Sequence, residues 1–293
     1  MLTRRKFLYT GAAAAAGIAA LGTDGFLQCE RLQVKKLEIP LARLPEAFDG
    51  LSIAHLSDFH YDQRFSVRPI RKAVEIVNQL RPDIVVLTGD FVTAPMFEYG
   101  SHNARQSAKR AAPCAQLLQM LQAPMGKFAV LGNHDAVSDS RKIVNDLQAH
   151  DIPVLQNRSI PLERGKARIW IAGVDDALDG MPDLAATIDK VPSGEATVLL
   201  AHEPDFADES SLRQVDLQLS GHSHGGQIWI PGIGAPWLPS LARKYPRGLY
   251  KVGNLTLYTN IGIGTIRAPV RINCPPEITL ITLRTVQSKS KNS

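Results

Sequence analysis

The sequence has few cysteines and no long hydrophobic run outside its N-terminal segment. Its 293 residues include three cysteines, which lie far apart at Cys29, Cys114 and Cys274. This number and spacing exclude a disulfide-rich scaffold and a cysteine-rich zinc site. No stretch beyond the N-terminus carries the ~20 consecutive apolar residues of a membrane-spanning helix, so a polytopic membrane protein is also excluded.

The composition is otherwise that of an ordinary globular protein. Hydrophobic residues make up 44% of the chain and charged residues 21%, which excludes disordered, collagen-like and coiled-coil proteins. The net charge is +5, but a good part of it lies at the two ends of the chain, at Arg4, Arg5, Lys6, Lys289 and Lys291. Because the body is not strongly basic, no nucleic-acid partner is expected.

Residues 1–25 have the features of an export signal. Two adjacent arginines, Arg4 and Arg5, precede an apolar run over residues 9–21. This arrangement resembles a twin-arginine signal, so we expect the twin-arginine export machinery as a partner. The expected location is the periplasm or the outer face of the cytoplasmic membrane. Cleavage near Ala20 and retention as a membrane anchor both fit the sequence.

Apolar runs and helical spacing alternate between residues 51 and 201. Ile70, Val74 and Val77, for example, recur at the spacing of one helix face. Apolar runs separated by helices are typical of an α/β fold with buried, largely parallel strands. We expect strands over residues 51–56, 84–87, 128–131, 169–174 and 197–201, and helices over residues 67–80, 107–121 and 138–149.

Beyond residue 214 the strands follow one another more closely, with glycine and proline between them. These strands predict a second, more antiparallel sheet that packs on the first. We expect its strands over residues 227–230, 248–252, 255–259 and 277–283. A single catalytic domain over residues 45–285 is the simplest partition, and the tail over residues 286–293 is expected to be disordered.

Polar clusters follow four of the strands, and a fifth follows the apolar run at residues 214–219. The clusters are Asp58-Phe59-His60, Gly89-Asp90, Gly132-Asn133-His134-Asp135, His202 and Gly221-His222-Ser223-His224. Because the carboxyl ends of strands in an open α/β sheet meet at one crevice, we expect these clusters to converge. Their nitrogen and oxygen donors, without a thiolate, suit zinc, manganese or iron.

The ordered set of clusters resembles the calcineurin-like metallophosphoesterases. Further similarity to an exported branch of that family, the YkuE-like and YaeI-like phosphoesterases, extends the resemblance to about residues 50–284. The residues that carry this further similarity are Gly225-Gly226-Gln227, residues 259–265, Pro269-Val270-Arg271 and Pro276-Glu277-Ile278. The resemblance implies a four-layer α-β-β-α sandwich built from two mixed sheets.

The resemblance also implies two divalent metal ions, each manganese, zinc or iron. Asp58, His60 and His224 would hold the first ion. Asn133, His202 and His222 would hold the second, and Asp90 would bridge both. His134 would face the substrate and act as the proton donor to the leaving oxygen, or stabilise the charge on it. Asp135 could orient the imidazole of His134.

The chemistry expected of such a site is the hydrolysis of a phosphate ester. Two divalent cations lower the pKa of a bridging water, so that a metal-bridging hydroxide is available near neutral pH. The same cations neutralise phosphate oxygens and align an in-line attack. The ordinary pKa of a histidine, near 6.5, suits His134 to proton donation. We therefore predict a phosphoesterase that acts on phosphodiester or related bonds.

Two other functions stay open at this point. One is a membrane-associated pyrophosphatase of lipid A synthesis, of the UDP-2,3-diacylglucosamine type. The other is a non-catalytic envelope protein that binds metal, although the presence of all seven ligands and His134 argues against it. One departure from the family is that Phe91-Val92-Thr93-Ala94 follows Gly89-Asp90, where many relatives carry an aspartate or asparagine that supports the bridging residue.

An apolar loop follows the last cluster directly, over residues 229–239. It is rich in glycine and proline, and an ordinary packed loop is one interpretation. The other is a hydrophobic lip that contacts a lipid substrate or the membrane surface, with Arg243, Lys244 and Arg247 near phosphate groups.

Overall fold

The computed structural model describes residue 9, residues 22–95 and residues 101–286. Most of the expected export segment, and the expected tail apart from Val286, therefore lie outside the described residues. Residues 22–28 form a short helical segment that precedes the domain. Within the described ranges, no helix has the length and apolar character needed to cross a membrane.

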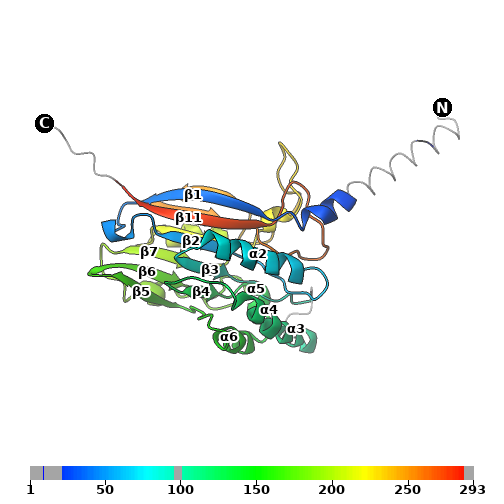
Figure 1. The fold of residues 1–293 in the computed structure, drawn as a ribbon, viewed down its shortest axis with the longest axis horizontal. Helices are drawn as coiled ribbons and strands as arrows, with labels where there is room; N and C mark the ends of the chain where they lie inside the picture. Colours follow the sequence, from blue (N-terminus) through cyan, green and yellow to red (C-terminus); the bar gives the residue numbers. More distant parts are fainter. Residues whose placement is uncertain (1–8, 10–21, 96–100, 287–293) are drawn as a thin grey trace.

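Two β-sheets lie face to face, and each is mixed (Figure 1). The first has the order β1-β11-β2-β3-β4. Strands β2, β3 and β4 run parallel, whereas β11 pairs antiparallel with β2 and parallel with β1. The strands are β1 (Gln33–Leu41), β2 (Ser52–Leu56), β3 (Ile84–Thr88), β4 (Lys127–Val130) and β11 (Glu277–Thr285).

The second sheet has the order β5-β6-β7-β8-β10-β9. Its four inner strands are parallel, and only the edge strands β5 and β9 pair antiparallel. The strands are β5 (Arg158–Arg164), β6 (Ala167–Gly173), β7 (Ala196–Leu200), β8 (Leu217–Ser220), β9 (Gly248–Val252) and β10 (Leu255–Thr259). The prediction of two mixed sheets is confirmed.

The central strands are buried on both faces because each sheet lies between two other layers. In β3, Val85 and Leu87 pack with the helices, whereas Val86 packs between the two sheets. In β7, Leu200 packs between the sheets and Leu199 packs with the outer helices. Successive side chains of a strand point to opposite faces, so a strand between two apolar layers needs an unbroken apolar sequence.

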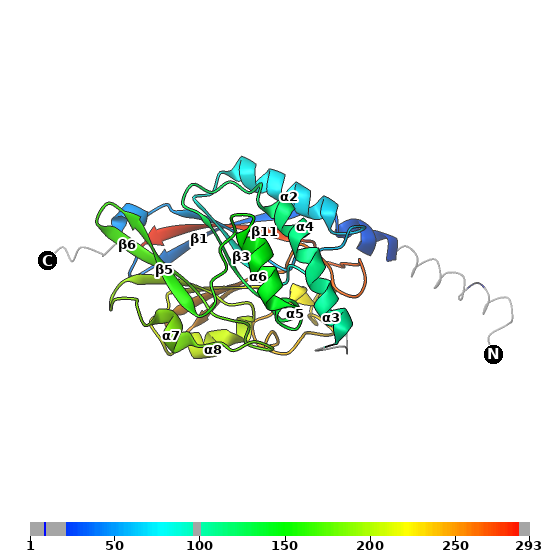
Figure 2. The ribbon, with the colours of Figure 1, turned by 90° about the horizontal axis from the view of Figure 1, so that it is seen from below.

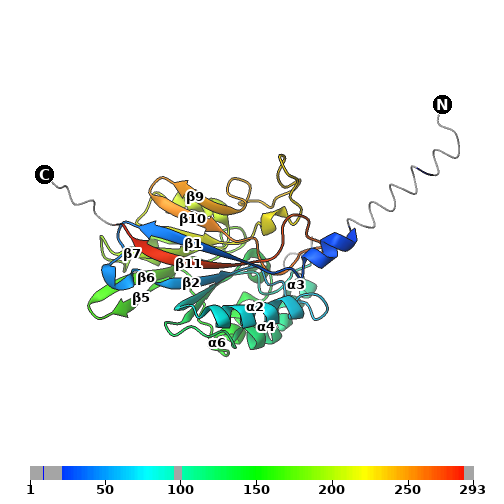
Figure 3. The ribbon, with the colours of Figure 1, turned by 45° about the horizontal axis from the view of Figure 1, so that its top comes forward.

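Helices cover the outer face of each sheet. On the first sheet lie α2 (Val67–Leu80), α4 (Ala111–Leu118) and α6 (Ser140–Gln148), on the side away from β9 and β10 (Figure 3). The short helices α7 (Leu184–Ile188) and α8 (Ala207–Ser210) lie on the opposite side of the molecule from α2 (Figure 2). The layers therefore follow the predicted α-β-β-α order. Two further short helices are α3 (His102–Ser107) and α5 (Asn133–Ala136).

Helix α2 has the predicted bounds, and its buried face carries the apolar residues that predicted it. Helix α6 begins at Ser140, two residues later than expected. Its N-cap is Asp139, whose side chain accepts a hydrogen bond from the Lys142 backbone N–H at 3.1 Å. The predicted helix over residues 107–121 is shorter than expected and is preceded by a 3₁₀ turn over Ala108–Arg110.

The assignment of strands to sheets was partly wrong. Strands β6 and β7 belong to the second sheet, and β11 belongs to the first, where it lies between β1 and β2. Residues 227–230 form only isolated bridges, such as Ile228 with Ile272. A strand that is buried on both faces has the same apolar pattern in either sheet, so its local sequence does not indicate which strand it pairs with. Edge strands β1 and β5 were not predicted, because exposed polar residues interrupt the apolar residues within each of them.

The parallel strands bring the predicted site together. Backbone hydrogen bonds join the loops that follow β2 and β3, from His60 N–H to the Asp90 carbonyl at 2.9 Å. The loops after β7 and β8 are joined in the same way, from Gly221 N–H to the His202 carbonyl at 2.9 Å. The two pairs of loops meet at the same end of the sandwich.

Ile171 offers a test of the core between the sheets. It is fully buried in β6, so Ile171→Ala should lower the free energy of unfolding by about 2–5 kcal/mol. The matched control is Leu212→Ala, because Leu212 is 82% exposed and should change stability by less than about 0.5 kcal/mol. Urea unfolding measures both values, and equal effects would contradict the packing described.

Candidate metal centre

The structure brings the predicted ligands into two neighbouring groups. The first contains Asp58, His60, Asp90 and His224, and the second contains Asp90, His202 and His222. Within each group the ligand atoms lie within 4.8 Å of one another. Asp90 belongs to both groups. The seventh predicted ligand, Asn133, lines the same cavity as Asp90 and His222.

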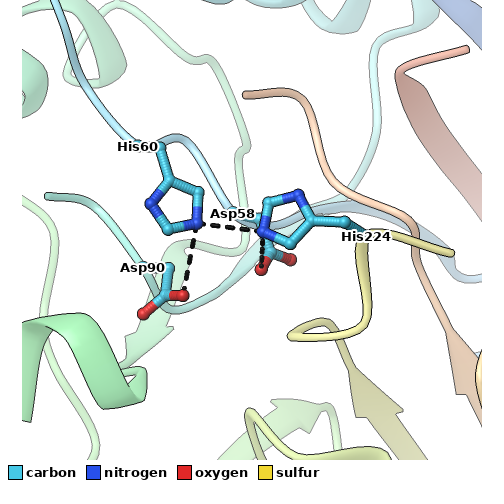
Figure 4. Close-up of side chains that lie close together, drawn as sticks. All are labelled: Asp58, His60, Asp90 and His224. Atoms are coloured by element: carbon cyan, nitrogen blue, oxygen red, sulfur yellow. Dashed lines mark hydrogen bonds and ion pairs between the residues drawn. The ribbon is translucent and has the colours of Figure 1, made fainter. Parts of the chain in front are cut away.

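The first group surrounds a space of the size of a metal ion (Figure 4). The Nε2 atoms of His60 and His224 point toward each other at 3.0 Å. His60 Nε2 lies 3.3 Å from Asp90 Oδ2, and His224 Nε2 lies 3.3 Å from Asp58 Oδ1. A tetrahedral ion with bonds of about 2.1 Å separates its ligands by about 3.4 Å. The spacing therefore fits a cation held by these four side chains.

Two of the predicted ligands of the second ion have buried polar atoms without a hydrogen bond. His202 Nε2 and Asn133 Oδ1 make no hydrogen bond with any described residue. His202 Nε2 lies 3.3 Å from Asp90 Oδ2, in the direction of the shared carboxylate. Leaving a buried polar atom unpaired costs about 1–3 kcal/mol, and coordination of a cation would satisfy both atoms. The donor set of the second group therefore fits a metal ion as well.

Hydrogen bonds from the outer side fix which nitrogen each histidine offers. His202 Nδ1 lies 2.5 Å from the Thr88 carbonyl and donates to it, so Nε2 is the nitrogen that His202 can offer to a ligand. His222 Nε2 lies 2.9 Å from the Ser240 carbonyl, so His222 offers Nδ1. Such contacts are typical of metal-binding histidines, because they set the tautomer and hold the ring.

The backbone at the predicted ligands is strained. Five of the seven adopt positive φ angles: Asp58 (53°), His60 (41°), Asp90 (55°), His222 (65°) and His224 (50°). This left-handed region is uncommon for residues other than glycine and costs about 1–3 kcal/mol each. The turns direct side chains from the strand ends into one space. Gly132 lies against the ring of His202, and a Cβ atom at Gly132 would come within 2.7 Å of His202 Cε1.

Burial and mutual charge set the ionisation of the group. Burial raises the pKa of Asp58. Burial acts in the same direction on Asp90, but the positive charges of His202 and His134 outweigh it and hold the pKa of Asp90 well below its usual range. Burial lowers the pKa of His222 to about 3. At neutral pH Asp90 is thus ionised and His222 is neutral, as metal binding requires. The charge of Asp90 outweighs burial at His202 and raises the pKa of that ring well above its usual range, so His202 must release a proton when a metal binds.

Asp135 does not orient His134, contrary to the sequence-based expectation. Its carboxylate accepts hydrogen bonds from the backbone N–H groups of Phe91 at 3.0 Å, Val92 at 3.2 Å and Gly132 at 3.0 Å. It therefore supports the loop that carries Asp90. This contact supplies the support that the departure at residues 91–94 had put in doubt, and Thr93 adds a contact to His60 Nδ1 at 3.0 Å.

His134 lines the cavity beside the two groups, and its ring is held by a backbone contact. The Ala94 N–H donates to His134 Nδ1 at 3.1 Å. Because Nδ1 accepts a proton donor, the ring's own proton lies on Nε2. Burial lowers the pKa of His134 to about 4, so the ring is neutral at pH 7. His134 is thus a neutral N–H donor next to the predicted metal ligands.

Sequence analysis gave no role to Arg271, which is fully buried behind the site. Its Nη2 donates to the carbonyls of Ile261, Gly262 and Gly264 at 3.0, 3.2 and 2.6 Å. Gly264 N–H in turn donates to the Asp58 carbonyl at 2.7 Å. Arg271 thus orders the loop that supports Asp58. The only signal in the sequence was its place in the Pro269-Val270-Arg271 resemblance.

Substitution of the shared carboxylate tests the two-group arrangement. Asp90→Asn removes the negative charge that both groups use, so the purified protein should contain less bound metal than the wild type. Asp151→Asn is the matched control, because Asp151 is exposed and has a similar φ angle of 58°. Metal per chain is measured by plasma mass spectrometry. Full metal content in Asp90→Asn would contradict the shared role of Asp90.

Comparisons with known proteins agree with this geometry. The chain is 34% identical to the metallophosphoesterase YkuE of Bacillus subtilis, over 97% of this chain and 98% of that protein. It is 30% identical to the phosphodiesterase YaeI of Escherichia coli, over 97% of this chain and 100% of that protein. The pattern of the calcineurin-like phosphoesterase family matches residues 51–226, which include all the predicted ligands. The chain therefore belongs to the calcineurin-like phosphoesterase family and is a metal-dependent phosphoesterase.

Proposed function

We propose that this protein hydrolyses phosphodiester bonds at a pair of divalent metal ions. The observation that carries the proposal is that Asp90 belongs to both ligand groups, so two ions bound there would share one carboxylate. Both groups open into the cavity that also contains His134. The choice of a diester is supported by the similarity to the phosphodiesterase YaeI.

In this proposal the ligands would divide between the ions as the sequence suggested. Asp58, His60 and His224 would hold one ion, and Asn133, His202 and His222 would hold the other. Asp90 would contact both. Nitrogen and oxygen donors of this kind suit manganese, zinc or iron.

The bound ions would acidify a water molecule to form the nucleophile and neutralise the phosphate oxygens. The protein keeps the site attractive to an anion, because only Asp58 and Asp90 contribute negative charge among the seven ligands. The neutral amide of Asn133 adds none. A phosphodiester anion would therefore enter a site that retains net positive charge.

His134 would act on the leaving oxygen through its Nε2–H. The Ala94 N–H occupies Nδ1, so a second proton on the ring would break that contact. A neutral imidazole with this tautomer stabilises developing negative charge by hydrogen bonding. The structure thus favours charge stabilisation by His134 over complete proton transfer from an imidazolium ion.

Removal of His134 should slow catalysis while the metal stays bound. We expect His134→Ala to lower kcat by about 10²–10⁴-fold on bis-p-nitrophenyl phosphate with added manganese. The loss should grow for substituted phenyl esters with more basic leaving groups, because these need more stabilisation. Kinetics over such a series measure the dependence.

Two controls accompany that series. A chelator should abolish wild-type turnover and added manganese should restore it; persistence of turnover without metal would refute the metal-dependent mechanism. If His134→Ala lost its metal, or lost the same factor on every leaving group, the role given to His134 would be wrong.

We further propose that the protein is exported by the twin-arginine route to the periplasm or to the outer face of the cytoplasmic membrane, where it would contact the membrane surface. The arginine pair at Arg4 and Arg5 supports this proposal. Replacing both by lysine should retain the protein in the cytoplasm, as measured by cell fractionation and immunoblotting. An unchanged distribution between fractions would refute the export route.

A further inference from the structure

The cavity above the predicted metal centre has two chemically different halves. Its volume is about 410 Å³, within the usual range for a small-molecule site. The floor carries polar groups, including Asp90, Asn133 and His134. The remaining wall is mostly apolar, with side chains from Leu178, Ile228, Trp237, Ile266 and Val270.

Apart from Leu178, the apolar wall is built from two loops that Gln227 joins. The Gln227 side chain accepts a hydrogen bond from Ile266 N–H at 2.6 Å and donates to the carbonyls of Ala268 and Val270 at 3.3 and 3.2 Å. Gln227 follows the last metal-ligand loop directly, and its own N–H donates to the His224 carbonyl at 3.0 Å. The wall is therefore tied to the metal centre.

Several apolar side chains of this wall remain accessible to solvent. Ile228 is 37% exposed and Trp237 is 49% exposed, and both line the cavity. Beyond the cavity, Ile233 in the same loop is 79% exposed. Exposed apolar side chains at a cavity mouth are typical of a surface that binds an apolar ligand. The wall is therefore suited to contact an apolar part of the substrate, away from the phosphate group.

The lining argues against a nucleotide in this half of the cavity. Trp237 is the only phenylalanine, tyrosine or tryptophan among the described residues that line it. The guanidinium of Arg267 lies over one face of that ring, 4.2 Å from its centroid. Base recognition usually needs a free aromatic face and a basic groove, and Arg267 is the only arginine or lysine among these lining residues.

We propose that the apolar wall binds the hydrocarbon chain of an amphiphilic phosphate ester. The phosphate would lie over the metal ligands, and the chain would run along Ile228, Trp237 and Ile266. This inference rests on the proposed function, because the phosphate must reach the metal centre. It adds the class of substrate: a phosphate ester with an alkyl or acyl group.

The loop over residues 229–239, the lip, lies at the end of the molecule from which the helical segment of residues 22–28 projects (Figures 1 and 3). Arg271 N–H donates to the Gly25 carbonyl at 2.9 Å, and Trp229 N–H donates to the Ile272 carbonyl at 2.9 Å. Residues 22–28, residues 270–273 and the lip therefore lie side by side. Phe26 and Leu27 expose further apolar surface on this helical segment. The same surface would allow the enzyme to take an amphiphile from a lipid bilayer.

The binding of alkylphosphonates, which resist hydrolysis, tests the proposal. Calorimetry on the manganese-loaded protein should show that affinity rises from methylphosphonate to decylphosphonate, by about fourfold for each methylene that enters the cavity. Decylphosphonate is used below its micellar concentration, so that single molecules bind. Equal affinity for the short and long compounds would overturn the proposal.

Variants of the wall locate the effect. Trp237→Ala and, independently, Ile228→Asn should lower the ratio of decyl to methyl affinity at least about fivefold. Leu212→Ala is the control, because Leu212 is exposed outside the cavity and should leave the ratio unchanged. An unchanged ratio in both wall variants would also overturn the proposal.

The experiment separates this inference from the proposed function. Failure of the proposed function appears as absence of metal-dependent turnover of bis-p-nitrophenyl phosphate, whatever the affinity ratio. Failure of the inference appears as a flat affinity series in a protein that does turn over the diester.

A further arm distinguishes a bilayer from a free amphiphile as the source of the chain. Two substrates are compared. One is a p-nitrophenyl phosphodiester of a long-chain alcohol in phosphatidylcholine vesicles, and the other is a soluble short-chain analogue of it. If the bilayer is the source, Ile233→Asp lowers the ratio of vesicle to soluble turnover, whereas Leu212→Asp does not. An unchanged ratio in Ile233→Asp assigns the source to free amphiphile.

Discussion

The carboxylate of Asp90 is the point on which the rest of the site depends. It belongs to both ligand groups, and the protein constrains it from several sides. Its Oδ1 accepts a hydrogen bond from the His134 backbone N–H at 3.0 Å, and its carbonyl accepts one from His60 N–H at 2.9 Å. Asp135 fixes the next two residues of the loop. A buried carboxylate with this support remains ionised and remains between the two groups.

The sandwich makes this arrangement possible because two sheets contribute strand ends to one location. Asp58 and Asp90 follow strands of the first sheet, whereas His202 and His222 follow strands of the second. The backbone N–H of His222 donates to both carboxylate oxygens of Asp58 at 3.1 Å, which links the sheets directly at the site. The apolar core between the sheets stabilises this junction, and it thereby compensates for the strained backbone at five predicted ligands.

Much of this could be predicted from the sequence, since polar residues at strand ends leave a local signal. Helix α2 and the convergence of Asp58, Asp90 and His222 followed from apolar periodicity and strand order. Sheet membership did not, because strand pairing depends on contacts between distant segments. The contact of Asp135 with Phe91 was also missed. It depends on the turn at residues 133–136, and a sequence shows which side chains are polar but not where a turn directs them.

The proposed site holds two divalent ions between seven side chains, and Asp90 contacts both ions. Anomalous diffraction from crystals of the manganese-loaded protein, recorded above and below the manganese absorption edge, tests this arrangement most directly. We expect two anomalous peaks that share Asp90, one beside Asp58, His60 and His224 and the other beside Asn133, His202 and His222. A single peak, or peaks away from Asp90, would contradict this arrangement.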